Sequence, residues 1–171
     1  MGRTSPVSLT AEPDPSVSAA LLAAEATCRS RGVQLTPIRK TVLRTLWESA
    51  RPLGAYEVMQ RLEAGLRRRL TPPTVYRALD FLLAQKLITK IESRNAFVPC
   101  AYPDHPHACV FFICENCGTS EEIEDSHLEQ LFDRKANSLG FRVSKRVLEL
   151  QGVCASCLGE TPSTSAVAVA L

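Results

Sequence analysis

The sequence lacks any long run of apolar residues. No such run approaches the ~18–20 residues that cross a bilayer, and the opening MGRTSPVSLTAEPDP holds no apolar signal-peptide core. Pro6 stands where an N-myristoylation pattern requires Ser or Thr. These absences predict a cytoplasmic protein without a membrane segment. In that reducing compartment, the seven cysteines favour metal binding over disulfides.

The signatures of common enzymes are also missing. The sequence contains no Ser/His/Asp set, no glycine-rich phosphate loop and no paired catalytic carboxylates. We therefore predict no enzymatic activity and no small-molecule substrate. The chain has 171 residues, 45% of them hydrophobic, so it is long enough to bury the core of one domain or of two small ones.

What the sequence does have is an uneven distribution of charge. Residues 1–90 carry 14 Lys and Arg against 7 Asp and Glu, a net +7, whereas residues 91–171 carry 6 against 11, a net −5. A basic half joined to an acidic half predicts a polyanion-binding part attached to a cation-binding part. Ordinary surface variation is the competing interpretation.

The first half has the pattern of several helices followed by a small hairpin. Thr36-Pro37 is a capping residue followed by the proline that a first helical position accepts. Periodicity predicts helices over 17–31, from Thr36 onward, over 54–64 and over 71–86, and strands at 87–91 and 96–98. This order describes a winged helix-turn-helix, whose last helix enters the major groove of DNA.

The second half predicts a small α/β unit. Strands are expected at 110–113 and 120–123, then a helix capped by Ser126 and ended by Gly140, then one or two further strands at 141–143 and 147–150. The fold class is α+β, with a tail (1–16), a winged-helix DNA-binding domain (17–99), a metal-binding dimerisation domain (100–160) and a C-terminal tail (161–171). The apolar stripe and sheet are large for so few residues, and the leftover apolar face predicts a homodimer.

Two CxxC pairs carry the strongest chemical signal. They are Cys114-x-x-Cys117 and Cys154-x-x-Cys157, with 36 residues between them. A CxxC turn lets two thiolates reach one ion, and four thiolates complete the tetrahedral set of a structural zinc site. The alternative is a redox dithiol, although a thioredoxin-like site uses one CxxC in a βαβ context rather than two.

A second, mixed ligand set lies close to the first pair. Cys100, His107 and Glu122 combine a sulfur, an imidazole and a carboxylate, which suits zinc but discriminates poorly against other first-row metals. The fourth ligand stays open among four residues: His105, Asp104, Glu121 and Cys109. The competing interpretation is that the histidines are only exposed polar residues of a proline-rich loop.

Several residues of the first half are candidates for contacting DNA. Arg77 is the candidate for a base contact, because arginine pairs bidentately with guanine, and Tyr56 for a base or sugar contact. The candidate phosphate contacts are Thr74, Tyr76, Arg39 and Lys90. The alternatives are that Tyr76 is a half-buried core aromatic and that the triple arginine 67–69 is only a solvated loop.

With these residues in view, the chain resembles the ferric uptake regulator superfamily. Four motifs carry the resemblance: Leu35-Thr36-Pro37-x-Arg39, PPTVYRALDFL from Pro72, FIC-x-x-CG from Phe112 and G-x-C-x-x-C from Gly152. They span most of the chain, and Asp80-Phe81-Leu82 favours the zinc-sensing branch. The resemblance implies a homodimeric repressor that binds a palindromic operator when zinc is bound and silences zinc-uptake genes.

The resemblance also implies two zinc ions per subunit. Cys114, Cys117, Cys154 and Cys157 match a structural site, while three residues match a regulatory site at the hinge between the halves: Cys100, His107 and Glu122. Thr89 stands where the zinc branch often has a histidine, so His105 is taken as the fourth regulatory ligand. Relatives that sense iron, manganese or peroxide are the alternative within the superfamily. An HHxH-like cluster, expected for iron or peroxide sensing, is reduced here to His105-Pro106-His107.

Overall fold

The computed structural model describes residues 15–100, 103, 109–123, 125–144 and 146–159. The chain separates into two compact units, Met1–Pro106 and His107–Leu171. The division lies later in the chain than the predicted boundary between 99 and 100. None of the described helices combines the length and the apolar character that a bilayer crossing needs.

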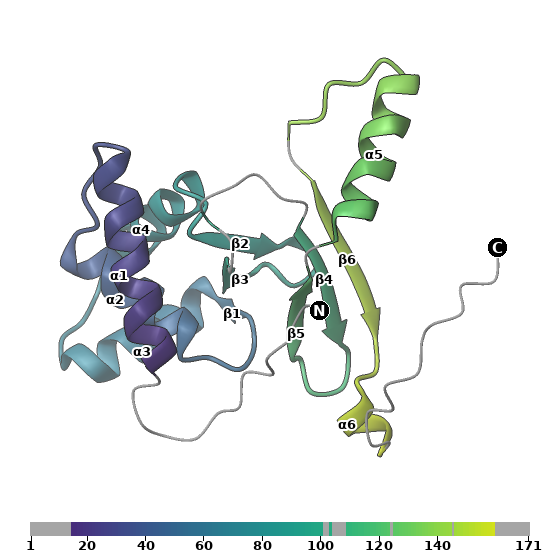
Figure 1. Ribbon diagram of the computed structural model, residues 1–171. Helices are drawn as coiled ribbons and strands as arrows, with labels where there is room; N and C mark the ends of the chain where they lie inside the picture. The colour runs from purple at the N-terminus through teal and green to yellow at the C-terminus, as the bar shows by residue number, and fades with distance from the viewer. Residues whose placement is uncertain (1–14, 101–102, 104–108, 124, 145, 160–171) are drawn as a thin grey trace. The chain divides into compact units, whose positions relative to one another are not determined.

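The first unit is built on a bundle of helices. They are α1 (Pro15–Ser30), α2 (Pro37–Trp47), α3 (Ala55–Leu66) and α4 (Pro72–Ala84), drawn in purple to teal in Figure 1. Each helix contributes side chains to one hydrophobic core, in which Leu21, Leu43, Leu62 and Leu79 are at most 2% exposed. Burial of such side chains, each stabilising by roughly 1.5–3 kcal/mol, explains why these segments are helical in this context.

Two of these helices begin as the sequence predicts. Thr36 and Thr71 have extended backbones and precede prolines at the start of α2 and α4. Neither threonine accepts a side-chain capping bond, so the helix starts are set by proline, whose φ is already helical and whose missing N–H costs nothing there.

A small sheet completes the first unit. Strands β2 (Ile88–Ile91) and β3 (Ala96–Pro99) pair antiparallel across the short 3-10 helix η1 (Glu92–Arg94), and β1 (Leu53–Gly54) pairs with the other edge of β3. The sequence did not indicate β1, because two residues carry no periodicity. The helices and hairpin form the predicted winged helix-turn-helix.

Arg31 ties the end of this unit to the end of α4. Its guanidinium donates to the carbonyl of Gln85, just after α4, and to the carbonyl of Pro103 at 2.9 Å. The backbone N–H of Cys100 also donates to the carbonyl of Leu87 at 3.0 Å. The segment that leads out of the hairpin is therefore fastened at two points to the turn that follows α4.

The second unit is a three-stranded sheet with two helices. Its elements are β4 (Cys109–Cys114), β5 (Ser120–Ile123), α5 (Ser126–Ser138), β6 (Val147–Gly152) and α6 (Ala155–Leu158). The strand order is β5-β4-β6, with β5 antiparallel and β6 parallel to the central strand. A parallel pair needs a crossover, which α5 supplies between β5 and β6.

Two sequence predictions for this unit are wrong in detail. Asp125, not Ser126, caps α5, because its carboxylate accepts from the backbone N–H groups of His127 (2.7 Å) and Leu128 (3.3 Å). Residues 141–143 form no strand: the N–H of Phe141 bonds back to the carbonyl of Ala136 and so closes the C-terminus of α5. Gly140, at φ 71°, makes that reversal possible.

Candidate metal centre and nucleic-acid interface

The two CxxC segments meet because β4 and β6 run side by side. Cys114 is the last residue of β4 and pairs in register with Gly152 at the end of β6. The N–H of Glu115 donates to the carbonyl of Gly152 at 2.7 Å. Cys154 then caps α6, which carries Cys157. The parallel register therefore brings together two turns that are far apart in sequence.

The four sulfurs form one cluster. The Sγ atoms of Cys114, Cys117, Cys154 and Cys157 all lie within 4.8 Å of one another. Those of Cys117 and Cys154 are 3.7 Å apart. A tetrahedral site with Zn–S bonds of ~2.3 Å has an S···S edge of about 3.8 Å, so the spacing fits zinc. None of the four cysteines is in a disulfide.

The local electrostatics favour a cation at this cluster. Backbone N–H groups, that of Cys117 first and that of Cys154 next, lower the pKa of Cys114 to about 6. Hydrogen bonds among the sulfurs, with Cys154 first, raise the pKa of Cys157 to about 12. One thiol is thus prepared to ionise, while four thiolates this close together cannot all do so without a positive ion. A thiolate-binding divalent metal such as zinc removes that conflict.

The predicted regulatory ligands lie partly outside the described residues and partly in different units. His105 and His107 lie outside the described residues. Cys100 is buried after β3 in the first unit, and Glu122 lies on β5 of the second. Thr89, which stands where the zinc-sensing branch of the superfamily often has a histidine, lies on β2 and is 8% exposed. The regulatory ligand set therefore stays a prediction.

Several of the residues predicted to contact DNA have exposed side chains. Tyr56, at the start of α3, is 66% exposed, and Tyr76 on α4 is 54% exposed, so Tyr76 is not a core residue. Arg77 beside it is also exposed. The hydroxyls of Thr74 and Thr71 are 2.8 Å apart. Large aromatics held outward beside an arginine suit contacts with bases and sugars.

Two of the predicted phosphate contacts have partners within the protein. The guanidinium of Arg39 lies 3.5 Å from the centre of the Phe81 ring and donates to the carbonyl of Gln34 at 2.7 Å. Lys90 forms a 2.6 Å ion pair with Glu92 on its own hairpin. A phosphate at either position competes with these contacts, whereas Arg77 forms no ion pair with any described residue.

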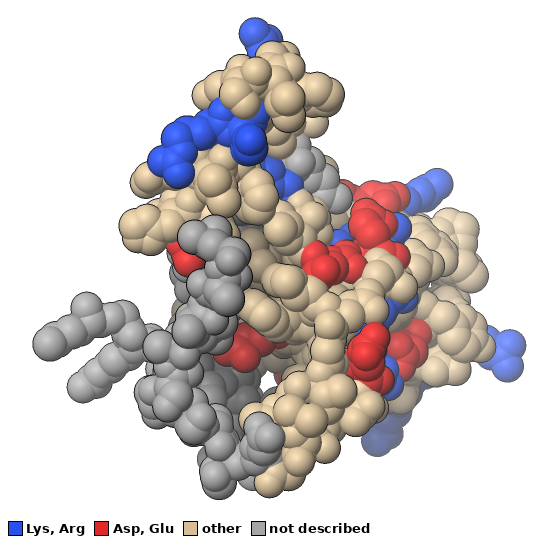
Figure 2. All heavy atoms as spheres, turned by 90° about the vertical axis from the view of Figure 1, so that its right-hand side faces the viewer, with Lys and Arg blue, Asp and Glu red and all other residues tan. Residues whose placement is uncertain are grey.

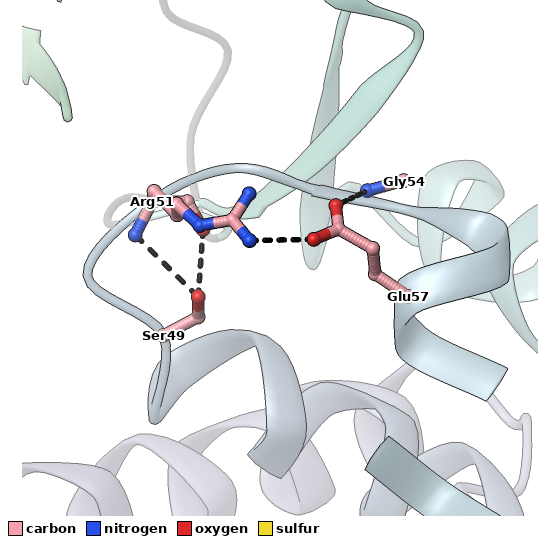
Figure 3. Close-up of polar contacts among 4 residues, drawn as sticks. All are labelled: Ser49, Arg51, Gly54 and Glu57. Atoms are coloured by element: carbon pink, nitrogen blue, oxygen red, sulfur yellow. Dashed lines mark hydrogen bonds and ion pairs between the residues drawn. The ribbon is translucent and has the colours of Figure 1, made fainter. Parts of the chain in front are cut away.

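A polar cluster that the sequence reasoning missed fixes the start of α3. The carboxylate of Glu57 accepts from the N–H of Gly54 at 3.2 Å and from Arg51 at 2.6 Å, and Ser49 binds the Arg51 backbone (Figure 3). These contacts lower the pKa of Glu57, the Arg51 hydrogen bond most of all. Gly-x-x-Glu before an apolar run is half of a capping box and was the available signal. The cluster orients the turn that carries Tyr56.

Comparisons with known proteins agree with this geometry. The model of the Ferric uptake regulator family matches residues 30–151, most of the chain. The zinc uptake regulation protein of Escherichia coli (strain K12) is 39% identical over 139 residues, which are 81% of this chain and 81% of that protein.

Solved structures give the same result. A zinc uptake regulator complexed with zinc and DNA superposes with a TM-score of 0.79 at 37% identity, covering 85% of this chain and 97% of that one. The holo form of XcZur superposes at 0.73 with 40% identity, covering 82% and 98%. The residues that the family model matches include α4 and the first cysteine pair, Cys114 and Cys117. The chain belongs to the ferric uptake regulator family.

Proposed function

We propose that this protein is a zinc-responsive transcriptional repressor. With zinc bound, its homodimer binds an operator in duplex DNA and represses zinc-uptake genes. The observation that carries the proposal is the likeness, at 37% identity and a TM-score of 0.79, to a zinc uptake regulator complexed with zinc and DNA. The family consists of transcriptional regulators, and the proposed DNA binding requires no catalysis. Because the DNA lies in the cytoplasm, we place the protein in that compartment.

The first unit supplies the DNA-reading surface. Helix α4 is the reader, with Arg77 for a guanine edge and Tyr56 on the neighbouring helix for a base or sugar. Thr74 and Tyr76 contact phosphates. Because the intramolecular partners of Arg39 and Lys90 compete with phosphate, these two contribute less than the exposed residues.

The second unit supplies the dimer contact. Phe112 and Leu150 are neighbours in register on β4 and β6 and are 49% and 44% exposed. Leu131 on α5, and Leu139 and Phe141 after it, are 46–71% exposed. A small unit that exposes so many large apolar side chains gains stability by covering them, and a second copy is the partner that closed symmetry favours.

Two zinc ions per subunit have different roles. The four-cysteine cluster holds a permanent ion, because all its ligands come from the protein and the site is closed. The second ion binds Cys100, His107, Glu122 and His105, which belong to both units. Zinc that binds the closed arrangement of the units better than the open one shifts the population toward the DNA-binding state.

A titration of operator DNA against free zinc tests the proposal. The four-cysteine site is kept filled, free zinc is set with a buffered chelator, and the affinity for DNA is read by fluorescence anisotropy. We expect the affinity to rise between about 5- and 150-fold as the second site fills, the usual range of allosteric coupling. Equal affinity with and without the second ion contradicts the zinc response.

Two controls separate the alternatives. Cys100→Ser should abolish the zinc response while keeping one zinc per subunit, because serine is a poor ligand for zinc. Repeating the titration with Fe²⁺ and Mn²⁺ tests a relative that senses another metal, since mixed ligand sets discriminate weakly. A thiol titration of the purified protein tests the redox alternative, which requires the four clustered cysteines to react freely.

A further inference from the structure

The loop between α3 and α4 holds an exposed run of three arginines. Arg67, Arg68 and Arg69 follow the last residue of α3, and two residues separate Arg69 from Pro72, where the reader helix begins. All three are exposed, and none of them forms an ion pair with a described residue. The loop therefore concentrates uncompensated positive charge beside the start of α4.

The loop is held in place at both ends. Arg67 adopts the left-handed conformation, φ 50°, and so turns the chain away from α3. At the other end the N–H of Leu70 donates to the Glu63 carboxylate at 2.7 Å, and the Leu70 side chain packs against the core. The arginine backbones are thus fixed to a rigid unit, which reduces the conformational entropy lost when the side chains bind a ligand.

No described acidic residue forms an ion pair with this loop. Glu63 is occupied by the Leu70 N–H, and Asp80 lies farther along α4, after Arg77. Guanidinium groups bind phosphate oxygens through two parallel N–H donors and are weakly hydrated for their charge. A row of three on one fixed loop matches a row of phosphates better than a single acidic side chain.

From this placement we infer that Arg67–Arg69 form a phosphate clamp that grips the DNA backbone outside the groove in which α4 lies. The inference rests on the proposed DNA binding and extends its contact surface to residues with no role in reading bases. Phosphate contacts raise affinity for any sequence and position the reader, whereas Arg77 supplies the choice of base. The clamp therefore strengthens operator and random DNA alike.

The test replaces the three arginines with glutamine in the full-length, zinc-bound protein. Arg67→Gln/Arg68→Gln/Arg69→Gln keeps polar, unbranched side chains and removes the charges. A matched control removes three exposed charges from the second unit, Arg134→Gln/Lys135→Gln/Arg142→Gln, in the region of α5, where basic side chains gather at the top of Figure 2. Affinities for operator and random duplexes are measured by anisotropy over a range of salt concentrations.

The loop variant should bind both duplexes at least about tenfold more weakly near 0.1 M salt. Its plot of log affinity against log salt should be about 2 to 5 units shallower, since each lost phosphate contact removes ~0.9 from the slope and a dimer carries two loops. The ratio of operator to random affinity should not change. The control should keep the slope of the parent protein, and both variants should keep its melting temperature.

Each other result overturns the inference. An unchanged slope shows that the loop does not touch phosphates, and an equal loss in the control shows that only net charge matters. A changed operator-to-random ratio shows that the arginines read bases. Failure of the parent protein to bind operator DNA with zinc instead contradicts the proposed function, while its binding to random DNA still tests the loop.

Discussion

The winged-helix unit and the sheet unit after it differ in how much of each is buried. In the first unit all four helices bury side chains in one core, and Val42, Leu53, Val58 and Leu79 have no measurable exposure. In the second, every buried apolar side chain among the described residues comes from β4, and α5 buries none. A covered core folds by itself, whereas a sheet with one buried strand needs other contacts.

The difference shows which interactions stabilise each unit. The first unit depends on the hydrophobic effect within one chain. In the second, the two partners we propose lie outside the polypeptide: a metal at the four cysteines and a second copy of the chain. The unit that carries the four-cysteine cluster is thus the one whose stability is expected to depend on what it binds, through linkage between binding and folding.

The largest expected effect comes from removing the structural metal. A chelator strong enough to empty the four-cysteine site, or Cys117→Ser, should destabilise the second unit by on the order of 10 kcal/mol, because metal binding there is coupled to folding. Hydrogen exchange should show β4 and β6 losing protection while α2 and α4 keep theirs. Equal loss in both units would show that they are not independent.

A core truncation in the first unit should have the opposite distribution. Leu79→Ala removes a fully buried side chain of α4 and should cost about 2–5 kcal/mol of unfolding free energy, measured with urea. The zinc of the four-cysteine site should remain bound. Leu22→Ala, on a residue 64% exposed, is the control and should change stability by less than about 0.5 kcal/mol.

A change on the bare face of the sheet should act on assembly. Phe112→Glu places a charge where the proposed dimer buries an apolar ring and should weaken dimerisation by about 2–3 kcal/mol or more, measured by sedimentation. The bound structural zinc should not change. Glu121→Gln, at the position opposite Phe112 on β5, is the control. A dimer that tolerates Phe112→Glu would place the interface elsewhere.

The smallest effect concerns the cap of α3. The pKa of Glu57 is lowered from 4.5, so its contribution is fully present above about pH 4.5 and is lost as the pH falls through the lowered value. Because the side chain is 38% exposed, only a few tenths of a kcal/mol are expected. In Glu57→Gln, the free energy of unfolding should fall less steeply as the pH is lowered below about 4.5. An unchanged pH dependence would show that the Arg51 contact does not persist in solution.

Much of the fold could be predicted because its signals are local. Thr36-Pro37 and Pro72-Pro73 mark helix starts, and spacing alone identified β5 to the residue. The wrong predictions concern residues whose local structure depends on a neighbouring side chain or turn. Asp125 caps α5 because its carboxylate accepts from two backbone N–H groups. The apolar run at 141–143 follows the turn that ends α5 and does not pair as a strand.

The candidate site divides in the same way. CxxC spacing indicates a metal-binding turn, and the exposure of Arg77 follows from its place opposite the buried residues of α4. For Tyr76 the sequence left exposure and partial burial open, and the structure shows it 54% exposed. The ring that Arg39 lies against could not be predicted, because Phe81 is far from it in sequence and approaches it only in the folded chain. The regulatory ligands remain a prediction from sequence.

By itself, the sequence determined the types of element, the thiol pairs and the basic reader, since each depends on residues a few positions apart. Only the tertiary structure decided that Cys114 stands in register with Gly152, so that the sulfurs of two distant turns form one cluster and backbone N–H groups lower the pKa of one thiol. The reason is that pairing of parallel strands depends on contacts across a long crossover, and no local pattern records them.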